Sequence, residues 1–330
     1  MLKNENSIFD IRHEDDFTAA CLSVFRYQAT ENGVYRQWLT YLGVEASRIQ
    51  SPAEIPFLPI SFFKRMPICC GEPAADTLVF TSSSTTGQIP SSHYVKNPNL
   101  YERSYVQGFE KFYGPAEDMV ILALLPNYLQ RQGSSLVYMV SDLIKRSRHA
   151  ESGFYLDDLE ALKHKLISLK QQDKKVLLIG VTYALLDLAE MDISLNDHFM
   201  VMETGGMKGR REEMVKEALH EHLKKAFQVN NVHSEYGMTE LLSQAYSKGD
   251  GLFEAPPWMR FVIREIDDPL QVQKPGKTGG INVIDLANIH SCSFIATQDL
   301  GKLTEKNHLQ LMGRFDHSDI RGCNLMVAGL

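Results

Sequence analysis

Short apolar runs alternate with helical segments through much of this chain, and this alternation most constrains its fold. The runs that read as buried strands are Met119–Leu125, Val176–Ile179 and Phe199–Met202. Each is followed by a segment with helical spacing of apolar residues, over residues 134–147, through Leu188, and over 210–227. Strands and helices in this order favour a largely parallel sheet covered by helices on both faces. The sequence therefore predicts an α/β fold.

The flanking regions add further helices and then a change of texture. Helical spacing recurs over residues 14–47, 97–113 and 156–171, and short strands are expected at 78–80 and 227–232. After residue 250 short strands and turns dominate, as in Met259–Glu265 and Thr278–Asp285. We therefore expect an α/β nucleotide- and acyl-binding core over residues 1–250 and a β-rich subdomain over 251–330.

Composition excludes several classes of function. The chain has 330 residues and a net charge of −7, so its overall field does not attract nucleic acid or an anionic membrane. The first residues lack the apolar stretch of a signal peptide, and no apolar run approaches the length of a membrane span. The five cysteines show neither a disulfide framework nor a Cys-x-x-Cys metal pair. We expect a cytoplasmic protein.

A loop rich in hydroxyl groups follows the expected strand at residues 78–80. Seven consecutive residues from Thr81 to Gly87 are serine, threonine or glycine. Such a loop presents backbone N–H and side-chain O–H donors to an anion, as a phosphate chain requires. No Gly-Lys-Ser or Gly-Lys-Thr follows, so it is not a Walker loop. From composition alone, a polar surface loop without a ligand is an equally good interpretation.

A second motif, Ser234–Glu240, combines a threonine, a carboxylate and an aromatic ring. Thr239 can donate a hydrogen bond to a phosphate oxygen. Glu240 can hold Mg²⁺, which prefers oxygen ligands, and Tyr236 offers a flat face to a base. In isolation the segment also reads as a turn before a helix beginning at Thr239.

The third motif consists of two turns. One, Thr297–Gly301, contains Asp299, and the other, Gly313–Asp316, contains Arg314. An aspartate in a loop is an acceptor for both hydroxyl groups of a ribose, and an arginine can donate to the same sugar. Each turn alone is a common surface feature.

Together and in this order, the motifs resemble those of the adenylate-forming superfamily of acyl-CoA synthetases, luciferase and adenylation domains. Its phosphate loop reads roughly SSGTTGxPK. Residues 82–91 are similar, with Ser84 in place of the glycine, an extra residue before Pro90 and Ser91 in place of the lysine. The other matching segments are Tyr236–Glu240 for YGxTE, Thr297–Asp299 for TGD, Gly313–Asp316 for GRxD, and Glu203–Gly206 for the glycine-rich strip against adenine.

The resemblance implies the large N-terminal domain of the adenylate-forming fold, which uses ATP and Mg²⁺ to convert a carboxylic acid into acyl-AMP. Thr239 would contact the α-phosphate and Glu240 would bind Mg²⁺. The other implied nucleotide-binding residues are Ser82, Ser83, Thr85, Thr86 and Gly87 for the phosphates, Gly205, Gly206 and Tyr236 around the adenine, Asp299 and Arg314 for the ribose, and Gly237 of the YGxTE segment.

Two further segments, Pro126–Met139 and Ile320–Leu325, look like the LuxE family, the acyl-protein synthetases of bacterial fatty-acid reductase complexes. The sequence ends at Leu330, so we expect the usual small C-terminal domain and its catalytic lysine to be absent. LuxE members hold the fatty acyl group as a thioester on a cysteine near their end. Cys323 stands at that place, and the neighbouring Arg321 favours its thiolate. The resemblance thus implies a fatty acid and an acyl-accepting partner such as a reductase or carrier.

Several alternatives stay open at this point. Cys323 could be a small apolar residue of a terminal strand, and the chain would then be an acyl-CoA or other acid ligase. It could also be a non-catalytic nucleotide-binding subunit of a complex. The expected lack of the lysine leaves three alternatives: Lys64, Lys302 or Arg321 replaces it, a second chain contributes a cation, or adenylation is slow. His93, Arg131 and His233 are further candidate binding residues.

Overall fold

The computed structural model describes residues 5–83, 89–126, 133–205, 214–274 and 276–315. Its helices are α1 (Glu14–Glu31), α2 (Gly33–Tyr41), α3 (Pro98–Tyr113), α4 (Ser135–Ser147), α5 (Leu159–Leu169), α6 (Thr182–Ala189) and α7 (Lys216–Phe227). Short 3-10 helices cover Glu5–Asp10, Ala46–Arg48, Pro52–Glu54, Ile60–Lys64 and Ala116–Asp118. Among these elements, no helix is long and apolar enough to span a membrane.

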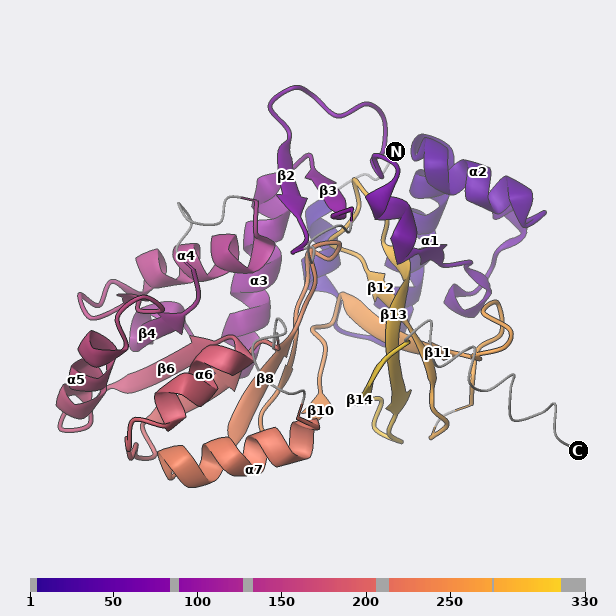
Figure 1. The fold of residues 1–330 in the computed structure, drawn as a ribbon. Helices are drawn as coiled ribbons and strands as arrows, with labels where there is room; N and C mark the ends of the chain where they lie inside the picture. Colours follow the sequence, from indigo (N-terminus) through magenta and orange to yellow (C-terminus); the bar gives the residue numbers. More distant parts are fainter. Residues whose placement is uncertain (1–4, 84–88, 127–132, 206–213, 275, 316–330) are drawn as a thin grey trace, which may run out of the picture.

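The first sheet has the order β5-β4-β6-β7-β8-β9 and is parallel except at β9. Its strands are β4 (Met119–Leu124), β5 (Gly153–Phe154), β6 (Lys175–Gly180), β7 (Phe199–Glu203), β8 (Val232–Tyr236) and β9 (Ala245–Ser247). All of β4 is buried, as expected for a central strand with helices on both faces. Figure 1 shows α6 and α7 in front of this sheet and α3 behind it.

The side chains of β8 show how the two faces are covered. His233 contacts Tyr113 of α3, with 5.6 Å between the ring centroids, whereas the hydroxyl of Ser234 lies 3.3 Å from Nε2 of His220 on α7. Successive residues of a strand point to opposite faces, so α3 and α7 lie on opposite sides of the sheet. Glu235 shares the α3 face with His233, and Tyr236 points the other way.

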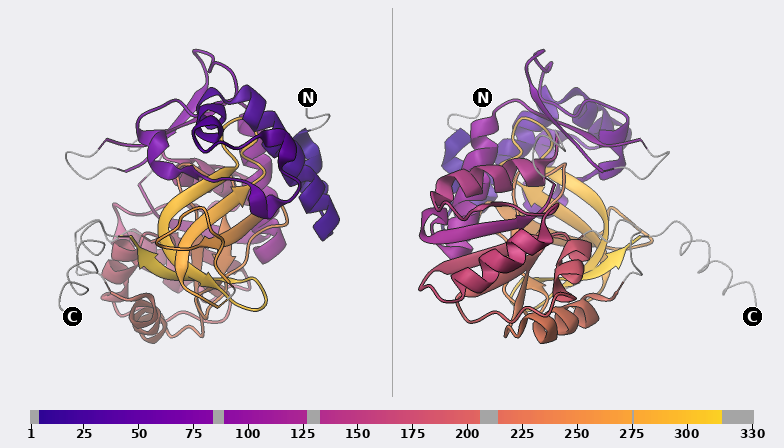
Figure 2. Two further views of the ribbon diagram at one scale, coloured as in Figure 1. Left: turned by 90° about the vertical axis from the view of Figure 1, so that its right-hand side faces the viewer. Right: turned by 60° about the vertical axis from the view of Figure 1, so that its left-hand side comes forward.

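The second sheet is antiparallel in the order β10-β14-β13-β12-β11, with β1 added in parallel to β13. Its strands are β1 (Leu58–Pro59), β10 (Leu252–Phe253), β11 (Met259–Arg264), β12 (Gly279–Asp285), β13 (Phe294–Leu303) and β14 (Leu309–Arg314). The left view of Figure 2 brings this sheet to the front in orange and yellow. One strand of this sheet, β1, comes from residues 58–59, so the sheet is not confined to residues 251–330. The predicted division of the chain at residue 250 stays a prediction. A two-stranded hairpin of β2 (Leu78–Thr81) and β3 (Ser92–Val95) carries the hydroxyl-rich loop.

The N-terminal helices pack on the second sheet through buried amides. Gln28 donates from Nε2 to the carbonyls of Asn288 and Ile289 and accepts from the N–H of Ser293. Asn32 donates to the carbonyl of Ser291 and caps α2 by accepting from the N–H of Tyr35. The helical region predicted over residues 14–47 is confirmed over most of its length. It is divided at Asn32, because the capping role of this residue requires extended backbone between α1 and α2, and it ends at Tyr41.

Two other element predictions need correction. The strand predicted at residues 227–232 is wrong because α7 continues to Phe227 and ends at Gln228, which adopts the left-handed conformation. The strand follows as β8. The helix predicted over 210–227 begins only at Lys216, with Val215 extended before it. Residues 210–213 lie outside the described part of the chain.

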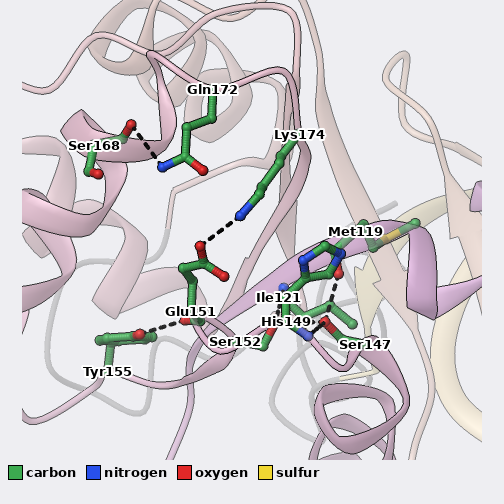
Figure 3. A network of polar contacts seen from close by, with 10 residues as sticks. All are labelled: Met119, Ile121, Ser147, His149, Glu151, Ser152, Tyr155, Ser168, Gln172 and Lys174. Carbon is green, nitrogen blue, oxygen red and sulfur yellow. Dashed lines mark hydrogen bonds and ion pairs between the residues drawn. The ribbon is translucent and has the colours of Figure 1, made fainter.

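A hydroxyl network fixes the connection from α4 to the edge strand β5, at the end of β4 away from Leu124 (Figure 3). Ser147 donates to the carbonyl of Met119 over 2.7 Å and contacts the hydroxyl of Ser152, which accepts from the N–H of Ile121. Lys174 pairs with Glu151 at 2.7 Å. These bonds satisfy backbone groups at the amino end of β4 and leave its carboxyl end to form the candidate site.

Candidate functional site

Two adjoining cavities lie where the carboxyl ends of β4, β6, β7 and β8 meet the β2–β3 hairpin. The smaller, of about 210 Å³, is lined from α3, α4 and these strand ends, and the larger, of about 320 Å³, from the hairpin and the second sheet. Ser83, Met238 and Thr239 line both. Ligands of open α/β sheets bind at the carboxyl ends of their strands, so the Thr239 turn stands between two candidate ligand compartments.

The larger cavity gathers residues from all three sequence motifs. We call it the charged cavity; its polar lining residues are Lys64, Ser82, Ser83, Ser91, Thr239, Glu240, Gln298 and Arg314. Thus Ser82 and Ser83 of the hairpin, Thr239 and Glu240 of the turn, and Arg314 of β14 meet at one place despite their separation in sequence. Two cations and several hydroxyl groups make this cavity suited to an anion.

The hairpin is closed by bonds between its two ends. The N–H of Ser82 donates to the carbonyl of Ser91 over 3.1 Å, and the N–H of Ser91 donates to the hydroxyl of Ser82 over 2.8 Å. Ser91, at the position of the superfamily's lysine, is buried and hydrogen-bonds through its side chain to Glu240. The predicted phosphate-binding residues Thr85, Thr86 and Gly87 lie outside the described residues.

Asp299 is held from two sides. Its Oδ2 accepts a hydrogen bond from the hydroxyl of Tyr236 over 2.9 Å, and its Oδ1 accepts from Nε of Arg314 over 2.9 Å. The β13–β14 register sets Asp299 opposite Arg314. The ring of Tyr236 packs against Phe253 and Phe261 and is 6% exposed. Its predicted contact with adenine stays a prediction.

The side chain of His93, on β3, contacts the turn that follows β8. Nδ1 of His93 lies 2.8 Å from the carbonyl of Thr239, and Nε2 lies 2.9 Å from Oδ1 of Asn288. Asn288 donates in turn to the carbonyl of Glu240 over 2.8 Å. Burial lowers the pKa of His93 to about 4, although its two acceptors raise it. A neutral ring donates from only one of its nitrogens, so His93 donates either to Thr239 or to Asn288, while Asn288 holds the carbonyl of Glu240. Thr239 and Glu240 form a turn and not the start of a helix.

Glu240 is suited to a divalent cation bound through one protein carboxylate. It is 5% exposed and lines the charged cavity. Burial raises the pKa of its carboxyl group, with Ser91 and the more distant charges of Arg314 and Lys64 acting in the opposite direction. No cluster of three or more His, Cys, Asp or Glu side chains with metal-binding spacing occurs among the described residues. One carboxylate and phosphate oxygens from a nucleotide are a usual ligand set for Mg²⁺.

The backbone at Gly205 is fixed by a buried ion pair. Oε2 of Glu203 accepts from the N–H of Gly205 over 2.7 Å, while Oε1 lies 2.9 Å from Nζ of Lys216. Burial alone would raise the pKa of Glu203, but hydrogen bonding by His220 and the charge of Lys216 lower it to about 2. Gly205 lines the smaller cavity and has φ of +71°. Gly206 lies outside the described residues.

The described cysteines do not reach the site. Cys21, Cys69, Cys70 and Cys292 are all buried. Burial raises the pKa of every one of these thiols, to about 12 for Cys21 and Cys292. The predicted acyl acceptor Cys323 lies outside the described residues, as does Arg131.

Some residues near the cavities carried little or no signal in the sequence. Lys64 was only one of several candidate cations, and Asn288, Glu235 and Gln244 belong to none of the motif positions taken as functional. They reach the site through strand register and the fold of the turn. His233, by contrast, contacts Tyr113 of α3 and does not line either cavity. A polar residue directly before a motif tyrosine, as Glu235 is, could have suggested a cavity-lining position.

No protein-family model matches the sequence, and no curated protein matches it either. Solved structures do match the fold. An open conformation of 2-hydroxyisobutyryl-CoA ligase, in complex with 2-HIB-AMP and CoA, superposes with a TM-score of 0.70 at 13% identity, covering 92% of this chain and 70% of the ligase. The same ligase in the thioesterification state gives a TM-score of 0.69 at 12% identity, with 96% and 72% covered.

ATP-bound MatB from Rhodopseudomonas palustris gives a TM-score of 0.54 at 17% identity, covering 72% of this chain. The chain spans 47% of the MatB chain, which is less than half its length. These identities are low, and the likeness concerns the arrangement of the backbone. The α/β architecture expected from the sequence is confirmed: this chain has the fold of the adenylate-forming ligases.

Proposed function

We propose that this protein activates a carboxylic acid with ATP, forming acyl-AMP and pyrophosphate. The observation that carries the proposal is the position of Thr239. Its turn separates a small cavity at the strand ends from a charged cavity containing Glu240, Lys64 and Arg314. An acid in the first compartment and a triphosphate in the second would meet at this turn.

The reaction needs alignment and charge neutralisation more than covalent help from the protein. A carboxylate oxygen of the acid attacks the α-phosphorus of ATP, and the bond from that phosphorus to the β-phosphate bridging oxygen breaks. Thr239 would donate to an oxygen of the α-phosphate. Ser82 and Ser83, with Thr85, Thr86 and Gly87 of the same loop, would hold the outer phosphates.

Other residues would position the nucleotide. Asp299, already oriented by Tyr236 and Arg314, would accept the ribose hydroxyls. Gly205, Gly206 and Tyr236 would border the adenine. Mg²⁺ bound at Glu240 would neutralise part of the phosphate charge. Lys64 and Arg314 are the described cations of the charged cavity, and they would neutralise phosphate charge there.

A second step, transfer of the acyl group to the thiolate of Cys323 with release of AMP, would make the chain an acyl-protein synthetase. Support comes from the other cysteines, because burial and raised thiol pKa values make those described poor nucleophiles. The acyl thioester would then pass to a reductase or carrier. The alternative acceptor is CoA, which is bound to the matching 2-hydroxyisobutyryl-CoA ligase.

The test combines pyrophosphate release with acyl labelling. The full chain is incubated with ATP, Mg²⁺ and a panel of carboxylic acids, with and without CoA. Acid-dependent pyrophosphate release is expected, together with acylated protein that is lost in Cys323→Ala but kept in Cys69→Ala. Release coupled only to acyl-CoA would support the CoA ligase instead. Absence of release with every acid and acceptor would contradict adenylation and favour a nucleotide-binding subunit.

A further inference from the structure

The smaller cavity contains two hydrogen-bond acceptors that the adenylation step does not use. Glu235 of β8 and Gln244, just before β9, both line it. They belong to the α3 side of the sheet, where Glu235 shares its face with His233. An apolar acid would leave both acceptors without a donor, so their presence bears directly on which acid this compartment takes.

Gln244 is nearly inaccessible and unsatisfied. It is 6% exposed, and its Oε1 has no hydrogen-bond partner among the described residues. An unpaired buried acceptor destabilises the structure, because it has lost its hydrogen bonds to water. A ligand group that donates to this oxygen would replace one of those bonds, whereas a methylene group in the same place would not.

Glu235 lies next to Gln244 across Gly237. A Cβ atom built on Gly237 would collide with Oε1 of Glu235 and would contact Cγ of Gln244 at 3.4 Å. The two side chains therefore converge on one small volume beside the Thr239 turn. No hydrogen bond to the Glu235 carboxylate is formed by the described residues. Burial and the charge of Glu203 raise the pKa of Glu235 to about 8, so a donor or cation beside it would stabilise its ionised form.

Two possible donors near these acceptors are engaged elsewhere. The hydroxyl of Tyr101, which lines the same cavity, donates to the carbonyl of Ser135 over 2.8 Å. Lys216, the cation that acts on Glu235, pairs with Glu203 at 2.9 Å. The cavity therefore lacks an internal donor from either of these groups, and a bound molecule can supply it.

We propose that the acid accepted by this cavity carries a hydroxyl or amino group that donates to Glu235 or Gln244. A hydroxyl group donates to one of these two acceptors, and an ammonium group can donate to both. This inference rests on the proposed adenylation function and specifies its substrate class. It departs from the fatty acid implied by the sequence resemblance, because an alkyl chain would offer no hydrogen-bond partner to the Glu235 carboxyl group or to the Gln244 amide oxygen. A hydroxyl group satisfies either protonation state of Glu235, whereas an ammonium group requires the ionised form.

The experiment uses matched sets of acids that differ only in the donor. One set is butanoate with its hydroxy and amino derivatives, a second is benzoate with its hydroxy and amino derivatives, and tetradecanoate represents fatty acids. Pyrophosphate release should give a kcat/KM at least about a hundredfold higher for a donor-bearing acid than for its bare analogue, because a site built around a donor rejects analogues that lack it.

Variants assign the selectivity to these side chains. Glu235→Leu and Gln244→Leu should each reduce the preference to roughly tenfold or less by lowering kcat/KM for the donor-bearing acid. Glu235→Gln distinguishes the two kinds of donor, because this variant should keep its activity with hydroxy acids and lose its activity with amino acids. The matched control is Glu217→Leu, an exposed residue of α7, which should keep wild-type selectivity.

The outcomes separate the two proposals. Equal or better use of tetradecanoate or butanoate by the wild type, unchanged in the cavity variants, would overturn the donor-bearing substrate while leaving adenylation intact. If no acid causes release of pyrophosphate, the proposed adenylation is contradicted. Thermal-shift titration with the same acids then tests the substrate class separately. Protection by donor-bearing acids that Glu235→Leu abolishes would support the inference, and protection by none of them would overturn it.

Discussion

The hydroxyl of Tyr236 on β8 donates a hydrogen bond to Asp299 on β13 over 2.9 Å, linking the parallel sheet to the antiparallel one. Both residues are buried, and Arg314 completes the arrangement by donating to the other carboxylate oxygen. The contact thus couples the orientation of a candidate ribose-binding carboxylate to the packing between sheets.

Asp299→Asn should weaken both nucleotide binding and the sheet contact. Loss of the charged acceptor should raise the KM for ATP about tenfold or more and lower the free energy of unfolding by about 1–3 kcal/mol. Tyr236→Phe keeps the ring packing and should affect mainly stability. A double-mutant cycle in chemical denaturation checks the pair, and additive single effects would contradict direct coupling.

Glu240→Gln should separate catalysis from stability. The loss of the carboxylate should lower kcat/KM at least about a hundredfold and weaken the dependence of activity on Mg²⁺. Because burial raises the pKa of this carboxyl group, removing its charge should leave the melting temperature unchanged or slightly higher. Magnesium titrations of both proteins provide the measurement. Wild-type magnesium dependence in the variant would exclude Glu240 as the metal ligand.

His93 should make stability fall as the pH decreases from about 6.5 to about 4. Its folded-state pKa is about 4 and its ordinary value is about 6.5. The unfolded chain therefore binds the extra proton in this window and gains stability relative to the folded one, by up to roughly 3 kcal/mol. His233, with its pKa lowered to about 4 by burial, Lys248 and His220, acts in the same direction.

The check is the free energy of unfolding measured against pH in wild type, His93→Gln and His233→Gln. Each variant should be less steep than wild type between these pH values, and His93→Gln should also lose stability at neutral pH, because Thr239 and Asn288 lose a partner. A wild-type slope in His93→Gln would contradict a neutral buried ring.

Glu203 should act at lower pH, and its pKa is also lowered in the folded state. Its folded-state pKa is about 2, against 4.5 ordinarily. Its carboxylate therefore contributes stability that is present above about pH 4.5 and lost as the pH falls toward 2. Glu203→Gln should be less stable at neutral pH, because Lys216 loses its anion, and should show a flatter acid profile. Lys216→Gln should reproduce part of this flattening of the stability profile at acid pH. A profile identical to that of the wild type would contradict the ion pair between Lys216 and Glu203.

Gly237→Ala should impair use of the acid more than use of ATP. The new Cβ would displace Oε1 of Glu235, the far end of a flexible side chain, so the fold should tolerate it. We expect the KM for the acid to rise about tenfold with a smaller change for ATP. Gly205→Ala is a useful contrast, since its φ of +71° and open surroundings predict backbone strain and a loss of stability. Equal effects of Gly237→Ala on both substrates would contradict the role assigned to Glu235.

The sequence by itself determined the parallel sheet and the motif residues of the charged cavity. Runs such as Met119–Leu124 contain only apolar residues, which suits a strand buried on both faces. Helix ends were less predictable, because Asn32 breaks the first helix through a bond to Ser291, far along the chain.

Only the tertiary structure decided which residues surround the candidate site. Gln244 and Asn288 have no local signature, because their roles depend on strand register and on contacts between distant segments. Asn288, for instance, meets His93 across 195 residues of sequence. Periodicity reports which face of an element is apolar, whereas the pairing of buried polar groups is satisfied only when the elements pack.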